Sequence, residues 1–207
     1  MGNICKRSPN NQCLEIVQKE FTENDEICGR IETIVGPMFS GKTTELQRRI
    51  NKYKFKRDNT IALIKSTHNT RDKGIQSHNG YKLKANFKTK NLMDIVEKLI
   101  PYRVIGIDEG HFFDEDLVEF CELMASSGKI VIVAGLDSDY LRRPLEHMTL
   151  LMAKSEKVVK LNAFCQYCGV EAAFTVKTEE DNELYKVGGD DIYKAVCRVC
   201  HKKYNKN

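Results

Sequence analysis

Residues 36–43 read GPMFSGKT and match the phosphate-binding pattern G-x-x-x-x-G-K-[ST] at every position. An apolar stretch precedes this loop and helix-forming residues follow it, so backbone N–H groups and a helix start can surround phosphate oxygens. In such a loop Lys42 reaches the β and γ phosphates of a nucleotide, and the Thr43 hydroxyl binds Mg²⁺. The predicted phosphate-binding residues are Gly36, Pro37, Met38, Phe39, Ser40, Gly41, Lys42 and Thr43.

A metal ion that bridges nucleotide phosphates needs a further protein ligand besides the phosphate loop. The sequence VIGID at 104–108 supplies a carboxylate for this role. Because Asp108 ends an apolar strand, we expect its carboxylate at the same sheet edge as the phosphate loop, where it binds the metal. A helix cap is the alternative for Asp108. Glu109 points elsewhere and is a candidate general base. From the residues alone, its target is equally a substrate hydroxyl or a water molecule.

Two classes of function fit this arrangement. The string DEGH at 108–111 resembles the DExH box of nucleic-acid motors, but such motors carry a second sheet domain for which 207 residues leave no room. A small kinase that acts on a small molecule fits this length, and we expect that class. The stretch 66–90 lacks an apolar period, so we expect a long loop, which would be the lid of this kinase. Within the lid, Arg71 is either a phosphate clamp or an exposed loop residue.

Four of the eight cysteines form two C-x-x-C pairs, which the 28 residues 169–196 separate. Two such pairs are typical of a structural zinc site, whose four thiolates leave no open position for catalysis. The surrounding segment has few aliphatic residues, so it needs a bound metal to stabilise its fold. A zinc module of this kind could also bind nucleic acid. The predicted ligands are Cys165, Cys168, Cys197 and Cys200. The adjacent His201 completes the haem-attachment string CRVCH, but zinc explains both pairs, and we expect His201 at the surface or beside the metal site.

Composition and the N-terminus indicate the compartment. Paired cysteines and the polar start MGNICKRSPNNQ favour a reducing compartment, and we expect the cytoplasm. No apolar run approaches the roughly 18 residues of a membrane span. The net charge of +4, with both signs spread along the chain, gives little reason to expect a nucleic-acid partner. Gly2 and Cys5 are candidate lipidation sites, but Lys6 stands where the myristoylation pattern needs Ser or Thr; an ordinary disordered tail is the alternative.

Apolar periodicity predicts alternating strands and helices, and hence an α/β fold: a P-loop NTPase-like parallel sheet with helices on both faces, plus a small zinc-ribbon-like domain. The expected strands are 31–35, 60–65, 103–107, 129–134 and 158–161, and the expected helices are 43–56, 91–100, 114–127 and 145–153. We divide the chain into an N-terminal extension, 1–30, which we expect to be disordered, a P-loop kinase domain, 31–161, and a zinc-binding domain with a substrate-covering loop, 162–207.

Taken together, several strings resemble the type II (cytosolic) thymidine kinase family. They are GPMFSGKTTELQRR from 36, NTR from 69, VIGIDEGHFF from 104, VEFCELMASSGKIVIVAGLD from 118, CQYCGVEAAFT from 165, GG at 188 and YKAVCRVC from 193. The resemblance covers residues 31–204 in unbroken order. It implies transfer of the γ-phosphoryl group of ATP to the 5′-hydroxyl of thymidine, a Mg²⁺ requirement, a structural zinc, a cytoplasmic homotetramer and no nucleic-acid partner.

The resemblance also assigns roles to particular residues. It makes Glu109 the general base that takes the 5′-hydroxyl proton. Beyond the phosphate loop, the residues that it places near ATP are Asn69, Thr70, Arg71, Asp108 and His111. The residues that it places around the nucleoside are Met38, Phe112, Leu136, Tyr140, Thr175, Leu184, Tyr185, Lys186, Val187, Gly188 and Tyr193.

Four positions depart from the family pattern. Asn69 stands where the family usually has Asp, which removes a charge near the phosphates. Tyr140 replaces a Phe and keeps a ring that can stack on the nucleoside. His111 replaces a common Gln, and Leu145 replaces a Phe, which loosens an aromatic wall. The last change implies a wider tolerance for the base.

Overall fold

The structure is a computed structural model, and it describes residues 29–54, 60–67, 75–76, 82–83, 85–113, 116–178 and 192–204. The extension expected at 1–30 lies outside these ranges except for its last two residues. Within the described parts, every helix is too short or too polar to traverse a lipid bilayer.

The centre of the fold is a sheet of six parallel strands in the order β5-β2-β6-β7-β1-β8. The strands are β1 (Arg30–Val35), β2 (Ile61–Ser66), β5 (Phe87–Thr89), β6 (Val104–Asp108), β7 (Ile130–Gly135) and β8 (Lys157–Lys160). From β1 the chain crosses over β7 and β6 to reach β2, and it later returns past β1 to β8. The carboxyl edge beside β1 is therefore the topological switch point at which parallel sheets bind ligands. The predicted α/β fold with a parallel sheet is confirmed.

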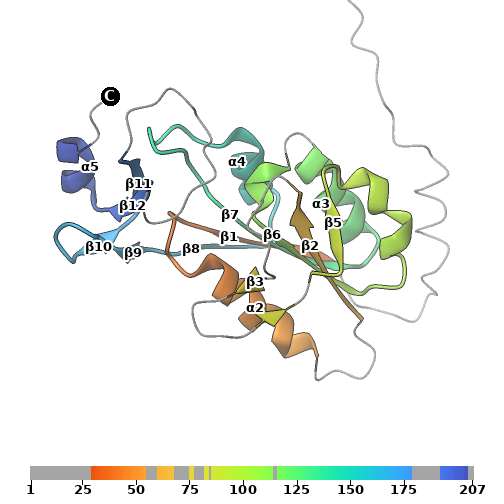
Figure 1. Ribbon diagram of the computed structural model, residues 1–207. Coiled ribbons are helices and arrows are strands. Elements are labelled where there is room, and N and C mark those ends of the chain that lie inside the picture. Colours follow the sequence, from red (N-terminus) through yellow and green to blue (C-terminus); the bar gives the residue numbers. More distant parts are fainter. Residues whose placement is uncertain are drawn as a thin grey trace, which may run out of the picture.

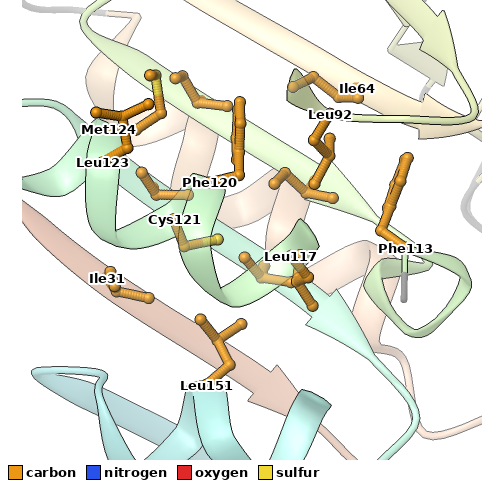
Figure 2. Close-up of a cluster of buried hydrophobic side chains, with 14 of the residues drawn as sticks. Ile31, Ile64, Leu92, Phe113, Leu117, Phe120, Cys121, Leu123, Met124 and Leu151 are labelled. Carbon is orange, nitrogen blue, oxygen red and sulfur yellow. The ribbon is translucent and has the colours of Figure 1, made fainter. Parts of the chain in front are cut away.

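Helices cover both faces of the sheet because successive strand residues alternate between its faces. Helix α2 (Lys42–Tyr53) packs Leu46 and Ile50 against one face, while α3 (Asp116–Ser126) and α4 (Glu146–Ala153) lie on the other face (Figure 1). Figure 2 shows the second face, where Phe120 and Leu117 of α3 lie among side chains of the sheet. At Gly106 of β6 an added Cβ would lie 2.3 Å from Ile50 Cδ1, so glycine permits the close approach of α2.

A buried ion pair fixes α2 against β1. Glu32 points from β1 toward the helix, and its Oε2 lies 2.8 Å from Arg49 Nη1, with both side chains at most 7 % exposed. Arg49 also contacts Glu45 one turn earlier in the helix. Because the phosphate loop connects β1 to α2, this pair holds both ends of the loop in place.

Two expectations about the stretch between β2 and β6 are wrong. The region 91–100 forms two short 3₁₀ turns, η1 (Met93–Ile95) and η2 (Glu97–Leu99), because its N–H groups bond to carbonyls three residues back. The region 66–90 is not a continuous loop. Strand β5 extends the main sheet, and β3 (Ile75–Gln76) pairs with β4 (Lys82–Leu83). These strands have two or three residues, which is too short for an apolar period.

The region after β8 forms a smaller module at one end of the sheet (Figure 1). It contains β9 (Ala163–Phe164) paired with β10 (Glu171–Ala172), β11 (Phe174–Lys177) paired with β12 (Tyr193–Val196), and α5 (Arg198–Tyr204). Its core is small, and two of its seven buried residues are Cys165 and Cys200. The exact domain boundary at 161–162 remains a prediction.

Candidate active site

The phosphate loop runs from the end of β1 to the start of α2 and has an unusual backbone. Gly36 has a φ of 146°, and an added Cβ would lie 2.2 Å from the Leu161 carbonyl oxygen, so only glycine fits. Phe39 adopts a left-handed φ of 64°. Non-glycine residues in this conformation are uncommon and concentrate at functional sites. The Pro37 carbonyl accepts bonds from Ser40 Oγ at 2.9 Å and from Lys42 Nζ at 2.6 Å, which turns both side chains into the loop.

Asp108 lies at the end of β6, beside this loop. It is buried, and its Oδ1 accepts a hydrogen bond of 3.1 Å from Thr43 Oγ1. Burial and the charge of Glu109 raise the pKa of Asp108 to about 7, against the opposing effects of Thr43, Lys65 and Lys42. A bound cation would favour the ionised carboxylate. The adjacent hydroxyl and carboxylate oxygens are hard donors of the kind that Mg²⁺ prefers, so the residues present fit this ion.

Lys42 lies among carboxylates. Burial lowers the pKa of its ammonium group, while the charges of Glu109, Asp108 and Asp137 oppose this shift. The end of β6, the loop after β7 and the start of α2 therefore bring Lys42 and three acids to a single edge of the sheet, where Lys65 of β2 also acts on Asp108. An anionic ligand with its own cations suits this arrangement.

Glu109 follows Asp108 and begins the short turn η3 (Gly110–Phe112) in a left-handed conformation, with a φ of 56°. The carboxylate is about one-third exposed, so a ligand can reach it. The Nε2 atom of His111 lies 3.5 Å from Glu109 Oε2.

The four predicted zinc ligands come together in the smaller module. Their sulfur atoms all lie within 4.8 Å of one another, with Cys168 Sγ 3.7 Å from that of Cys197 and 3.6 Å from that of Cys200. A tetrahedral site with Zn–S bonds of about 2.3 Å requires sulfur separations of about 3.8 Å, whereas a disulfide would need about 2.05 Å. The cysteines therefore fit a zinc ion. The sequence reasoning that paired them is consistent with this geometry.

Two hydrogen bonds connect the zinc module to the sheet. Thr175 Oγ1 of β11 accepts a bond of 3.1 Å from the Met38 N–H of the phosphate loop. His201 Nε2 of α5 lies 2.9 Å from the carbonyl oxygen of Tyr140. His201 is buried and follows the ligand Cys200, so it lies beside the metal site and not at the surface. The module therefore contacts both the loop and the segment that carries Tyr140.

The described residues that the resemblance assigns to the nucleoside come from the sheet half and from the zinc module, and their grouping into one site stays a prediction. Tyr140, Thr175 and Tyr193 are buried, and Tyr193 pairs with Lys177 across β11 and β12. Leu136 and Phe112 contact His111 by a hydrogen bond and by ring packing. The other predicted residues lie outside the described ranges: Asn69, Thr70, Arg71, Leu184, Tyr185, Lys186, Val187 and Gly188.

Sequence reasoning missed some residues of this site. Lys65, the next-to-last residue of β2, lies directly opposite Asp108 in the register and is buried. Its position at the end of the apolar run IALIK was a usable signal, because parallel strands end at the same edge. Asp137, after β7, forms an ion pair with Lys160. His147 of α4 contacts the backbone of η3, which no local pattern indicates.

Comparison with known proteins is consistent with this geometry. A family model described as thymidine kinase matches residues 29–201. The thymidine kinase of vaccinia virus (strain Western Reserve) is 44% identical over 173 residues, which cover 84% of this chain and 97% of that protein. That of raccoon poxvirus is 45% identical over 174 residues, with coverages of 84% and 97%. That of Amsacta moorei entomopoxvirus is 43% identical over 179 residues, with coverages of 83% and 97%.

Proposed function

The chain belongs to the thymidine kinase family, and from this premise we propose that it transfers the γ-phosphoryl group of ATP to the 5′-hydroxyl of thymidine. One observation carries the proposal beyond the family match. The phosphate loop and Glu109 lie at one sheet edge, and the zinc module contacts that loop through Thr175. A nucleotide site and a second substrate site therefore adjoin each other.

The phosphate side of the site is proposed to work by charge and position. The loop N–H groups and Lys42 bind the triphosphate and stabilise the negative charge that spreads over the transferred group. Thr43 and Asp108 would hold Mg²⁺, which supplies further neutralisation of that charge when bound. Lys65, buried opposite Asp108, adds a positive charge that favours the ionised carboxylate.

The acceptor side is proposed to depend on Glu109. Its carboxylate accepts the proton of the nucleoside 5′-hydroxyl and orients that oxygen in line with the γ-phosphorus. The exposure of the carboxylate allows this contact, and its neighbour Asp108 stays with the metal. This assignment favours the hydroxyl over water as the target of the base.

The zinc module is proposed to hold the nucleoside and exclude water. Met38, Phe112, Leu136, Tyr140, Thr175 and Tyr193 would surround the base, and the chain between the cysteine pairs would cover it. Exclusion of water prevents loss of the phosphoryl group by hydrolysis. Zinc acts structurally in this scheme, because four thiolates complete its coordination. A cytoplasmic location and assembly as a homotetramer complete the proposal.

A phosphoryl-transfer assay tests this function. The full chain is incubated with γ-labelled ATP and Mg²⁺ against thymidine, deoxyuridine, deoxycytidine and uridine, and single-stranded DNA-stimulated ATP hydrolysis is measured alongside. We expect labelled thymidine monophosphate as the main product and little hydrolysis. Hydrolysis that depends on DNA, without a phosphorylated nucleoside, would contradict the proposal. The matched control is Glu109→Gln, which should bind ATP and lose most turnover.

A further inference from the structure

The side chain of His111 is almost fully buried beside the proposed base, with a hydrogen bond to Nδ1 and the Glu109 carboxylate close to Nε2. Its exposure is 3 %. The Leu136 N–H donates a hydrogen bond of 3.2 Å to Nδ1. A nitrogen that accepts a bond carries no proton, so a neutral ring has its proton on Nε2. That nitrogen lies 3.5 Å from Glu109 Oε2.

The backbone around His111 is also held. His147 Nε2 of α4 lies 3.2 Å from the His111 carbonyl oxygen, and the ring of Phe112 packs against that of His111 with centroids 4.3 Å apart. The Phe113 N–H donates to the Gly110 carbonyl at 3.0 Å and closes η3. The imidazole thus connects the end of β7 to the residue that starts this turn.

The surroundings keep the ring neutral. Burial lowers the pKa of His111 to about 4, the Glu109 carboxylate opposes this shift, and the nearby Lys42 and His147 act in the same direction as burial. A neutral ring with Nε2–H offers one donor to the carboxylate. It offers no second donor, which leaves little capacity for a phosphate contact.

We propose that His111 is a positioning residue for Glu109: Leu136 N–H fixes the Nε2–H tautomer, and Nε2–H holds the carboxylate in the orientation that meets the nucleoside hydroxyl. The inference rests on the proposed function. It gives His111 a different role from the ATP contact that the family resemblance implies. The proposal requires the separation of 3.5 Å to shorten when substrate binds, as hydrogen bonds of catalytic groups commonly do.

Two substitutions separate positioning from phosphate binding. His111→Phe keeps a planar ring and removes both nitrogens, whereas His111→Gln offers an amide oxygen to Leu136 N–H and an amide N–H to Glu109. We expect His111→Phe to lower kcat about 10- to 100-fold, with the KM for thymidine and the Kd for ATP unchanged. His111→Gln should recover most of kcat. A loss of ATP affinity at normal kcat would overturn the proposal, as would full activity of His111→Phe.

A second measurement reads the tautomer without using activity. In ¹⁵N-histidine spectra of the wild type, assigned with His111→Gln, the His111 signals should show a neutral ring protonated at Nε2, and Glu109→Gln should shift them. A proton on Nδ1, or no response to Glu109→Gln, would overturn the arrangement even if His111→Phe fails to fold. If the wild type phosphorylates no nucleoside, both the proposed function and the role of His111 in catalysis are overturned. If the wild type is active and His111→Phe is fully active, only the positioning role of His111 is overturned.

Discussion

The two halves of the proposed site are held in different ways. The sheet buries hydrophobic clusters on both faces, and it positions the phosphate loop, Asp108 and Glu109 by packing and by strand register. The zinc module has a buried cluster of seven residues, of which two are cysteines that fit the metal. Apolar burial can hold the first half, while the second depends on metal ligation. In the proposed site, the hydrophobic core would support the ATP side, and the module that fits a zinc ion would complete the nucleoside side.

Loss of zinc should give the largest effect, because structural zinc contributes about 10–16 kcal/mol in small domains. Cys165→Ser removes one thiolate and should abolish stoichiometric zinc binding and unfold the module, while the sheet keeps its own unfolding transition. Metal analysis and hydrogen exchange of β11 and β12 check this. Cys121→Ala is the control, since Cys121 is buried in α3 far along the chain from the ligands. If Cys165→Ser still bound stoichiometric zinc, the proposed dependence of the module on metal ligation by Cys165 would be wrong.

Disruption of the buried ion pair should weaken the sheet half alone. Arg49→Met leaves the buried Glu32 with only the partly exposed Arg30 as an ion-pair partner, at a cost of about 3 kcal/mol, the low end of the range for a broken buried pair. The exposed neighbour Arg48, which contacts the same Glu45, is the matched control, and Arg48→Met should cost at most about 1 kcal/mol. Chemical denaturation measures both. Equal effects of the two substitutions would show that the buried pair does not hold α2 to β1.

The contact between the halves should show a smaller effect. Thr175→Val removes the acceptor of the Met38 N–H with little change of shape and should cost about 1–3 kcal/mol of ground-state binding. We expect this as a higher KM for thymidine with zinc retained. Thr178→Val lies in the same module and removes a bond to the Ile192 carbonyl instead, so it serves as the control. If Thr175→Val left the KM for thymidine unchanged, the hydrogen bond between the two halves would contribute nothing to thymidine binding.

The smallest effect concerns the acid sensitivity of α2. The hydrogen bond from Arg48, with the contact from Arg49, lowers the pKa of Glu45 to about 2 against the opposing effect of burial. The unfolded value is higher, at 4.5, so this stabilisation is complete above that pH and declines as pH falls toward 2. Glu45→Gln should cost about 0.5 kcal/mol near neutral pH. Denaturation curves between pH 7 and pH 4 should show the difference between wild type and variant shrinking only below about pH 4.5; a constant difference at lower pH would contradict it.

The sequence predicted the parts of the fold that depend on local patterns. The apolar strands before Gly36 and Asp108 lie where the periodicity placed them, and the glycines of the loop have the conformations that its motif needs. The cysteine spacing likewise anticipated the four-sulfur cluster. In each case a few neighbouring residues determine the outcome.

Other features depend on contacts between distant segments. Strand β5 is added to the edge of the sheet by pairing with β2, although three residues carry no period. The helix expected at 91–100 became 3₁₀ turns, and Asn91 Oδ1 accepts the Met93 N–H at their start. The bond from Leu136 to His111 spans 25 residues, so only the folded chain reveals it.

The central claim is that the sheet half binds ATP by itself, while nucleoside binding needs the zinc module together with residues of the sheet half. Titration calorimetry of full-length wild type and Cys165→Ser, with Mg²⁺ and a non-hydrolysable ATP analogue or with thymidine, tests it most directly. We predict that Cys165→Ser keeps its affinity for the ATP analogue to within about threefold and loses measurable thymidine binding. Thymidine binding that survives loss of zinc, or an equal loss of both ligands, would contradict the account.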